Sequence, residues 1–314
     1  MPPFRFSVVI CAYTEDRLDN IYAAISSVHN QNRPGAEIIL VIDNNPTLYK
    51  RLLDELTDVT IVENAAGPGL SGARNTGIGH AHGEIVVFLD DDATAEPDWL
   101  NSLDRAYANP DIIGVGGLTL PQWQTARPHW FPEEFYWVVG CNYTGMPTSG
   151  QRVRNLLGAN MSFRREAFSL VDGFRAGVGR TSSGRPLGCE ETEFCIRLGQ
   201  RSPRSILTIE HRAVVRHLVP DIRCRFSYFI SRCFAEGISK ALVTGTVGSE
   251  DGLSAERDYT TRTLPLGVLK GVADLFRGDP GGLGRATAIL VGLSVTVSGY
   301  MFGRFRSTRV GYVS

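Results

Sequence analysis

The residues best suited to chemistry are three consecutive carboxylates, Asp90, Asp91 and Asp92, which follow an apolar run in the segment VVFLDDDA. Neighbouring like charges repel, so the group needs a cation or abundant solvent. Mg²⁺ and Mn²⁺ suit it, because these ions take a few carboxylate oxygens and leave the other positions to water and phosphate oxygens. Acidic residues after a strand can also cap the next helix and face water. The three residues alone do not decide between these interpretations.

A second acidic segment, CEETEF, offers candidates for a general base. Glu190 and Glu191 are adjacent at the expected start of a helix and therefore project in different directions, whereas Glu193 and Arg197 are four residues apart and can pair on one face. Alternatively, these acids only complement the partial positive charge of a helix N-terminus. His217, in VVRHLVP, is likewise either a metal ligand or a packed strand residue.

The elements that must position these residues alternate along the first hundred residues. Strands are predicted at 6–12, 37–42, 59–62 and 84–89, with amphipathic helices between them. Apolar strands joined by helical crossovers form a parallel sheet that is covered on both faces, and ligands lie beyond the carboxyl ends of its strands. We therefore expect Asp43, which follows the second strand, to lie at the same sheet edge as the three aspartates.

The pattern changes after a helix expected at 97–108 and a strand expected at 112–118. Residues 121–148 carry seven aromatic side chains among prolines and polar residues, which either line a substrate surface or bury one another: Trp123, Trp130, Phe131, Phe135, Tyr136, Trp137 and Tyr143. Regular structure is then predicted at 156–163, 165–170, 190–201, 213–218 and 226–242.

A stretch near the C-terminus, residues 286–303, contains no charge and is flanked by Arg285 and Arg304. It is just long enough for a membrane span, but its glycines, serines and threonines make it only moderately apolar. A preferred apolar face favours a helix that lies on a membrane or is buried in the protein. The residues that mark this face are Ile289, Leu290, Leu293, Val297 and Met301.

Composition places the chain among folded globular proteins, with 43% hydrophobic and 21% charged residues in a length of 314. Lys plus Arg is 32 against 33 for Asp plus Glu, so nucleic-acid binding is not expected. The six cysteines lack paired spacing, which argues against a zinc ribbon or a disulfide framework. Because no export signal is visible either, we expect a cytoplasmic protein.

Six segments occur in an order that resembles glycosyltransferase family 2: VVICAYTEDRL, IILVIDNNP, GPGLSGARNTGI, IVVFLDDDATAEPDWL, LLGANMSFRREAF and CEETEFCIRL. The resemblance covers roughly residues 7–219. It implies the A-type glycosyltransferase fold, an α/β fold with a mostly parallel sheet flanked by helices. We expect a nucleotide-sugar-binding half at 1–120, an acceptor and catalytic half at 121–220, and a C-terminal helical extension at 221–314 that can associate with a membrane.

The resemblance implies donor-binding roles for residues after the first and second strands, on the third crossover and after the fourth strand. These residues are Ala12, Tyr13, Thr14, Glu15, Asp43, Arg74, Asn75, Asp90 and Asp91. In the family, the residue at the position of Asp43 reads the uracil edge, and the segment around Arg74 lies beside the diphosphate.

The resemblance also implies a divalent cation, Mn²⁺ or Mg²⁺, held by Asp92 as the most direct ligand, by Asp90 and by His217. A metal that bridges the diphosphate neutralises the charge that develops on the leaving phosphate. The metal implied here is therefore catalytic as well as binding.

The base that the resemblance implies is Glu191, with Glu190 next to it as a second catalytic candidate and an acceptor contact. Here the sequence departs from the family pattern, because Glu stands where Asp is usual. The longer side chain moves the carboxylate by about one methylene, and catalytic placement is sensitive at roughly the 1 Å scale. Asn160, in a short turn after Gly158, is expected to contact the acceptor.

Together these features predict an inverting transfer of one sugar from a UDP-sugar, or another nucleotide-sugar, to an acceptor hydroxyl. The absence of a QxxRW segment and of several long apolar spans favours a single transfer over processive synthesis. The basic stretch after His217 and the apolar helix suggest a lipid-linked or cell-envelope acceptor at the inner face of the membrane. A nucleotidyltransferase and an inactive sugar-nucleotide-binding scaffold are the alternatives, and a homo-oligomer is compatible with the sequence.

Overall fold

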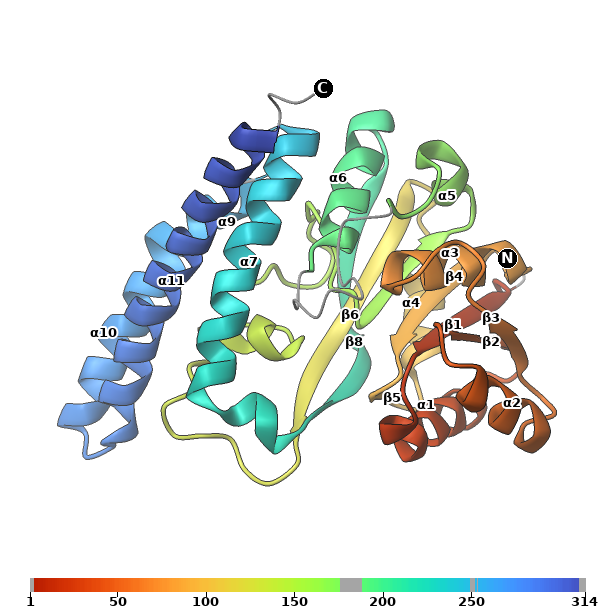
Figure 1. The fold of residues 1–314 in the computed structure, drawn as a ribbon, viewed down its shortest axis with the longest axis horizontal. Coiled ribbons are helices and arrows are strands. Elements are labelled where there is room, and N and C mark those ends of the chain that lie inside the picture. The colour runs from red at the N-terminus through yellow and green to blue at the C-terminus, as the bar shows by residue number, and fades with distance from the viewer. Residues whose placement is uncertain (1–2, 176–187, 249–251, 253, 311–314) are drawn as a thin grey trace. The chain divides into compact units, whose positions relative to one another are not determined.

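This computed structural model describes residues 3–175, 188–248, 252 and 254–310 of the chain (Figure 1). The chain divides into two compact units. The first consists of Met1–Leu120, Pro147–Gly184 and Glu190–His217, and the second of Pro121–Met146, Arg185–Cys189 and Leu218–Ser314.

Four parallel strands form the first half of an eight-stranded sheet in the order β3-β2-β1-β4. They are β1 (Phe6–Ala12), β2 (Glu37–Ile42), β3 (Thr60–Glu63) and β4 (Ile85–Asp90). The connecting helices are α1 (Leu18–His29), α2 (Pro46–Glu55) and α3 (Leu70–His80). The central strands are buried almost throughout, as expected when helical crossovers cover both faces of a parallel sheet.

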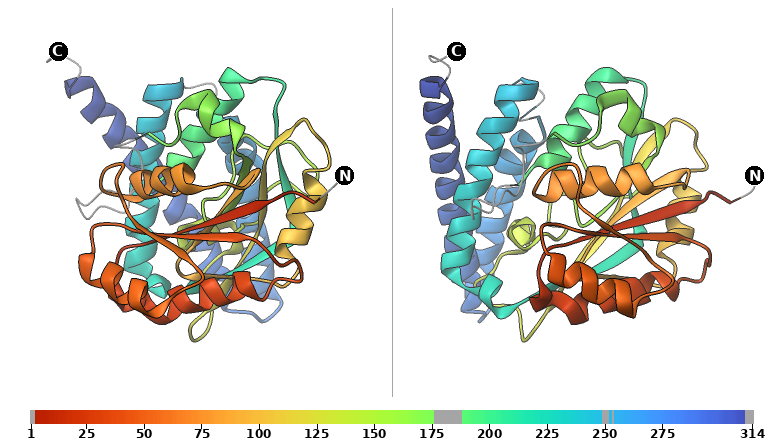
Figure 2. Two further views of the ribbon diagram at one scale, coloured as in Figure 1. Left: turned by 90° about the vertical axis from the view of Figure 1, so that its right-hand side faces the viewer. Right: turned by 45° about the vertical axis from the view of Figure 1, so that its right-hand side comes forward.

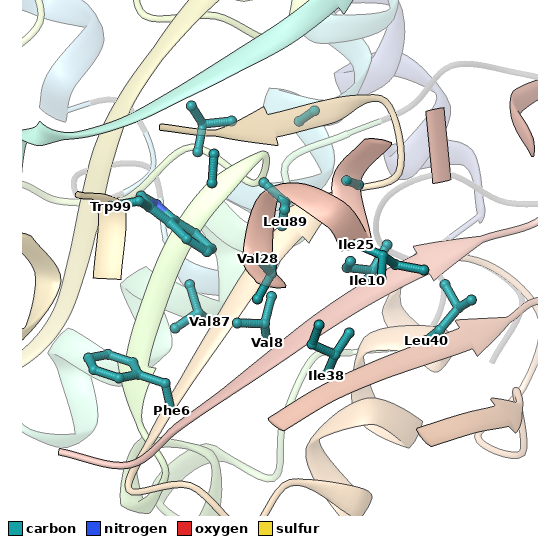
Figure 3. Packing of buried hydrophobic residues seen from close by; sticks show 14 of the residues in the cluster. Phe6, Val8, Ile10, Ile25, Val28, Ile38, Leu40, Val87, Leu89 and Trp99 are labelled. Carbon is teal, nitrogen blue, oxygen red and sulfur yellow. The ribbon is translucent and has the colours of Figure 1, made fainter. Parts of the chain in front are cut away.

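Alternate side chains of these strands enter two separate hydrophobic clusters, one on each face of the sheet. Val8 and Leu40 pack with residues of α1 and α2, as Figure 3 shows for Val8, Leu40 and the α1 residue Ile25. Val9 and Ile39 pack in the other cluster with α3, which lies on the opposite side of the strands in Figure 2. The βαβ arrangement expected from the apolar spacing is confirmed.

The second half of the sheet is antiparallel, so the sheet as a whole is mixed. Its strands are β5 (Ala93–Ala95), β6 (Ile112–Trp123), β7 (Asn160–Arg164) and β8 (Ile206–Val219). Its helices are α4 (Trp99–Ala106), α5 (Glu166–Val171) and α6 (Glu190–Arg201). The short strand β5 pairs with the far end of β8, which places the turn after β4 beside the last residues of β8.

The second unit is mainly helical in its described residues. It contains the 3-10 helices η2 (Glu133–Val139) and η3 (Asp221–Cys224), the π-helical turn η4 (Tyr259–Thr263) and the helices α7 (Phe226–Val247), α9 (Ser254–Asp258), α10 (Leu264–Phe276) and α11 (Gly281–Val310). The helix α11 packs along both α7 and α10 (Figure 1).

The aromatic segment at 121–148 forms the core of this second unit. Phe131 and Phe135 are buried, and both contact the ring of Phe229 in α7. Trp130 stacks on Phe131 with 5.2 Å between ring centroids. Of the two interpretations of this segment, mutual burial is therefore the one that the structure supports for these rings, because aromatic pairs gain from edge-to-face and stacked packing.

The helix α11 is longer than the expected 286–303. Its N-terminus is supported by Asp279, whose Oδ1 accepts a hydrogen bond from the Gly281 backbone N–H. Among the described residues one helix, Gly281–Arg306, is long and apolar enough to cross a membrane by length and composition alone. Of the expected apolar face, Ile289 is buried, whereas Leu290 and Met301 are exposed.

Candidate active site

The three aspartates lie at the carboxyl end of β4, where ligands of parallel sheets bind. Asp90 is the last residue of the strand and is half-buried, and Asp91 and Asp92 in the following turn are only 4% and 6% exposed. The expected alternative of helix-capping acids in open solvent therefore does not apply to Asp91 and Asp92. Two buried carboxylates require partners of opposite charge or a metal ion.

One partner is His217, which comes from the far end of β8. The antiparallel register of β5 and β8 places Ala93 opposite His217 and so brings the ring beside Asp92. Its Nε2 lies 3.0 Å from Asp92 Oδ1 and 3.8 Å from Asp90 Oδ2. The ligand atoms of Asp90, Asp92 and His217 all lie within 4.8 Å of one another.

These three side chains fit a divalent ion. Two carboxylate oxygens and an imidazole nitrogen suit Mn²⁺, and a set of three protein ligands leaves coordination positions for water and phosphate oxygens. The fit rests on convergence, since atoms from two separate strands point at one small volume.

The other partner is Arg17, which the sequence reasoning missed. Arg17 ends the 3-10 helix η1 (Glu15–Arg17), and its Nη1 lies 2.8 Å from Asp91 Oδ1 and 3.3 Å from Asp92 Oδ2. The two oxygens of Asp92 thus face different groups, His217 on one side and Arg17 on the other. The available signal was an arginine directly after the acids of CAYTEDR, at the carboxyl end of the first strand.

Burial dominates the electrostatics of Asp91. Desolvation and the charge of Asp92 raise the pKa of its carboxyl, the guanidinium of Arg17 opposes them, and the net pKa is about 6. Its Oδ1 accepts the hydrogen bond from Arg17, whereas its Oδ2 is buried and has no hydrogen-bond partner among the described residues.

Arg74 connects the end of β4 to the start of α6. It is 2% exposed, and its Nη1 donates to Glu190 Oε1 at 2.9 Å while its Nη2 lies 4.0 Å from Asp90 Oδ1. The guanidinium carbon also lies 5.7 Å and 5.4 Å from the ring centroids of Phe88 and Phe174. Arg74 is therefore held on several sides, and it fixes Glu190 relative to the aspartates.

The two candidate bases at the start of α6 have different surroundings. Glu190 is 4% exposed and bound to Arg74, and its Oε2 is buried without a hydrogen-bond partner in the described part of the chain. Glu191 is half-buried. Glu193 is fully buried and pairs with Arg197 at 2.6 Å, which confirms the expected pair four residues apart.

The residues expected around the nucleotide lie mostly in loops beside β1 and β2. Asp43 Oδ1 accepts a hydrogen bond from the side chain of Asn64 at 2.7 Å, and its Oδ2 accepts one from the Gly69 backbone N–H at 2.9 Å. Asp43 is therefore already oriented by the loop that precedes α3. The ring of Tyr13 is exposed, and the guanidinium of Arg17 lies over it.

Three other residues expected at the donor lie at the end of β1 or directly after it. The backbone carbonyl of Ala12 accepts a hydrogen bond from the Asp43 N–H at 2.8 Å. Thr14 accepts a hydrogen bond from the backbone N–H of Asp16 at 3.2 Å, and Glu15 is exposed.

Two of the expected contact residues are engaged with the protein itself. Asn160 is buried at the start of β7, where its Oδ1 accepts from Trp99 Nε1 at 2.9 Å and its Nδ2 donates to the Ala213 carbonyl at 3.0 Å. Asn75 forms two hydrogen bonds with the backbone of Phe174. A contact of either side chain with donor or acceptor stays a prediction, and it would have to compete with these bonds.

Comparison with known proteins gives matches over most of the chain. Residues 7–171 match the family model of Glycosyl transferase family 2. The chain is 34% identical over 243 residues, 76% of its own length and 77% of the relative, to the glucosyl-dolichyl phosphate glucuronosyltransferase of Haloferax volcanii. It is 28% identical over 137 residues, 39% of its length and 53% of the relative, to the UDP-Glc:alpha-D-GlcNAc-diphosphoundecaprenol beta-1,3-glucosyltransferase WfgD of Escherichia coli.

A solved structure shares the fold. The mannosyltransferase PcManGT from Pyrobaculum calidifontis, in complex with GDP-Man and Mn²⁺, superposes with a TM-score of 0.62 over 95% of this chain and 87% of that one, at 16% identity. The expected A-type fold, with helices flanking the sheet and a helical C-terminal region, is thereby confirmed.

Proposed function

Because the chain belongs to glycosyl transferase family 2 and is a glycosyltransferase, we propose that it transfers one sugar from a UDP-sugar to the hydroxyl of a lipid-linked acceptor, with inversion and with a divalent cation. The observation that carries this proposal is the convergence of Asp90, Asp92 and His217 at the end of β4. A divalent ion held by this ligand set would neutralise the negative charge of a diphosphate leaving group.

The proposed metal ligands are Asp92 Oδ1, Asp90 Oδ2 and His217 Nε2. An ion held by these atoms would supply positive charge where negative charge develops on the leaving diphosphate. Arg17 holds the other oxygen of Asp92, at 3.3 Å, and so turns Oδ1 toward His217. Outer partners of this kind orient ligands and set metal affinity.

We assign the general base to Glu191. Protonating Glu190 would break its ion pair with the buried Arg74, which leaves an uncompensated buried charge. Glu191 follows it on the same helix and projects about 100° away, because an α-helix has about 3.6 residues per turn. Its carboxylate takes the proton of the acceptor hydroxyl while that oxygen bonds to the anomeric carbon.

In the same step the bond from the anomeric carbon to the donor phosphate breaks, and its electron pair leaves with the diphosphate. A single displacement inverts the configuration at the anomeric carbon. Arg74 acts as a positioning residue, because it ties the start of α6 to the end of β4 through Glu190 and Asp90. Glu190 is proposed to contribute to the acceptor subsite beside Glu191.

The donor and acceptor classes rest on the relatives. The name of the Escherichia coli relative includes UDP-Glc and a diphosphoundecaprenol acceptor, and that of the Haloferax relative includes a dolichyl phosphate. We extend both to this chain and propose a polyprenyl-linked acceptor at the inner face of the cell membrane. Asp43, oriented by Asn64 and Gly69, is proposed to receive the base edge of the nucleotide.

The test measures donor binding and turnover with and without metal. UDP-glucose, UDP-galactose, UDP-glucuronate and GDP-mannose are each added to the purified protein with Mn²⁺, Mg²⁺ or EDTA. We expect one UDP-sugar to raise the melting temperature only with metal, since a ligand that binds the folded form stabilises it. The same donor should release UDP in the presence of a polyprenyl-phosphate or polyprenyl-diphosphate sugar acceptor.

The variant Asp92→Asn should lose metal-dependent UDP release by about 10²-fold or more, whereas Asp54→Asn, an exposed acid on α2, should not. Retained metal-dependent turnover in Asp92→Asn would contradict the metal site. Release of pyrophosphate from a nucleoside triphosphate and a sugar phosphate would instead identify a nucleotidyltransferase. Donor binding without turnover toward any acceptor would identify a binding scaffold.

A further inference from the structure

The helices α10 and α11 expose large apolar side chains that a protein in water normally buries. Leu266, Leu269 and Phe276 on α10 are 65%, 66% and 84% exposed. Spacings of three and seven residues place them on one stripe of the helix. This stripe lies within the extension 221–314, for which membrane association was expected, but outside the apolar stretch 286–303.

A second stripe runs along α11. Leu290, Val297 and Met301, spaced seven and four residues apart, are 56%, 51% and 64% exposed. The opposite side of α11 packs on α7 and α10 (Figure 1). We call the two exposed stripes together, Leu266, Leu269, Phe276, Leu290, Val297 and Met301, the hairpin surface. Large exposed apolar residues that repeat along a helix are typical of an interaction surface.

Three hydroxyl groups on α11 form hydrogen bonds within the helix. The hydroxyls of Ser294 and Ser298 donate to the carbonyls of Leu290 and Ser294 at 2.9 Å and 2.8 Å, and that of Thr296 donates to the Gly292 carbonyl at 2.8 Å. A helix in contact with hydrocarbon needs such internal bonds, because lipid offers its hydroxyls no partner. The serines of the exposed side are therefore compatible with an apolar environment.

The charge of this region favours an anionic partner. Between Leu264 and Arg306 the sequence has five basic residues and only two acids, Asp274 and Asp279. Both acids pair with Arg285, at 2.9 Å and 2.7 Å. The excess of positive charge beside the apolar stripes matches anionic lipid headgroups, which attract basic residues near a membrane surface.

The packing of the helices argues against crossing the bilayer. The helix α10 has 13 residues, about 20 Å at a rise of about 1.5 Å per residue, which is shorter than the apolar core of about 30 Å. The helix α11 is long enough, but it is in backbone contact with α7: a Cβ on Gly299 would lie 2.2 Å from the Phe234 carbonyl oxygen.

The helix α7 carries ionic side chains next to its contact with α11, where a Cβ on Gly237 would lie 2.1 Å from the Thr296 carbonyl oxygen. Glu236 lies 3.2 Å from Lys240 and 3.8 Å from Arg232. The side chains of Glu236, Lys240 and Arg232 are only 14%, 21% and 11% exposed. If α11 spanned a membrane, these charges would reach membrane depth with it, at a large free-energy cost. A helix that lies along the surface avoids that cost.

We propose that α10 and α11 form a monotopic membrane anchor whose hairpin surface inserts into the headgroup region of an anionic leaflet without crossing it. The proposal goes beyond the catalytic function, since vesicle binding needs no donor, metal or acceptor. Its failure would leave the transfer reaction proposed above untouched. It also explains how an enzyme without several spanning helices among its described residues meets a lipid-linked acceptor.

The experiment is flotation of the full chain with vesicles of phosphatidylglycerol and phosphatidylcholine, compared with phosphatidylcholine alone. Two variants each place charges in one stripe, Leu266→Glu with Leu269→Glu in α10, and Leu290→Glu with Val297→Glu in α11. The matched control is Leu53→Glu, which charges a 50% exposed leucine on α2 in the other unit. Circular dichroism and metal-dependent donor hydrolysis report whether each variant is folded.

We expect the wild-type chain and Leu53→Glu to float with the anionic vesicles, less so at high salt, and each stripe variant to bind them about tenfold more weakly or worse. Wild-type binding by a folded α10 variant would overturn the two-helix anchor. Resistance of the bound chain to alkaline carbonate would overturn the monotopic arrangement in favour of a span. A wild-type dimer that ignores vesicles and becomes monomeric in the stripe variants would assign the surface to a second copy of the chain.

Discussion

The end of β4 and the α10–α11 hairpin depart from an ordinary soluble core in opposite ways. Around β4 the chain buries charges, since Asp91, Asp92, Arg74 and Glu190 are all less than a tenth exposed. On the hairpin it exposes apolar side chains, and Phe276 is 84% exposed. Each departure is costly in the isolated chain, because buried ions lose hydration and exposed apolar groups order water.

The difference indicates which kind of ligand would stabilise each region. The buried carboxylates have incomplete internal partners: Asp91 Oδ2 and Glu190 Oε2 lack hydrogen bonds among the described residues. On α11 the hydroxyls of Ser294 and Ser298 are hydrogen-bonded within the helix, whereas the apolar side chains Leu290, Val297 and Met301 are exposed. The first region therefore suits small charged ligands, whereas the second suits an extended apolar surface. Four predictions test this contrast.

The largest effect is expected from Glu191→Gln. Loss of a general base should lower kcat by about 10²- to 10⁴-fold, while donor and metal affinity stay unchanged because the side chain keeps its size. Single-turnover transfer rates and donor titrations measure the two quantities. The control is Glu166→Gln, which changes an exposed acid at the start of α5. Full sugar-transfer activity in Glu191→Gln would show that another group is the general base.

The next effect concerns stability. Arg74→Met removes the partner of the buried Glu190 and should lower the free energy of unfolding by about 3–5 kcal/mol. The double variant Arg74→Met with Glu190→Gln should recover part of the loss, because the buried residue 190 then carries no charge. Urea unfolding monitored by circular dichroism measures both. Equal stability of the two variants would show that the pair does not stabilise the fold as an ion pair.

A smaller effect is expected for pH. The pKa of Asp91 is raised from 3.8 to about 6, mainly by burial. In the metal-free protein the contribution of this carboxyl to the free energy of unfolding is therefore present at low pH and is lost as the pH rises through about 6. Between pH 4 and pH 7 the shift corresponds to roughly 2 kcal/mol. The difference in unfolding free energy between wild type and Asp91→Asn should change by this amount, and a difference that is constant with pH would contradict the shift.

The smallest effect is expected on the hairpin surface. Leu266→Gln should change the free energy of unfolding by less than about 0.5 kcal/mol, because the side chain is 65% exposed and supports no core. Leu264→Gln, two residues earlier and 2% exposed, should cost several-fold more. Thermal unfolding of the two variants side by side tests whether the stripe is structural or is free to bind.

Local spacing predicted the first half of the fold well. The expected strands at 6–12 and 37–42 coincide with β1 and β2, because apolar runs and helical crossovers alternate within short stretches of chain. The later strands had other bounds than expected: β8 begins at Ile206 rather than at 213, β6 continues to Trp123 rather than to 118, and β7 begins at Asn160 rather than at 156. Pairing of antiparallel strands depends on distant segments, which no local window contains.

The residue types of the site were visible in the sequence, whereas their partners were not. Three adjacent aspartates require compensation, and CEETEF offers acids at a helix start, whatever the fold. That Arg17 and His217 provide the compensation follows from the turn after β1 and from the register of β5 on β8. These contacts join residues 74 or more positions apart, and no spacing rule reaches so far.

The same division holds for the hairpin. Apolar periodicity in 286–303 predicted a helix with one apolar side, and these residues lie in the helix α11. Packing decided which apolar residues stay exposed. Ile289 is buried in a cluster with Phe229 of α7 and with aromatic rings of the segment at 121–148, whereas Leu290 and Met301 are exposed. Amphipathic spacing specifies that a helix needs an apolar partner, and tertiary contacts decide which residues receive one within the chain.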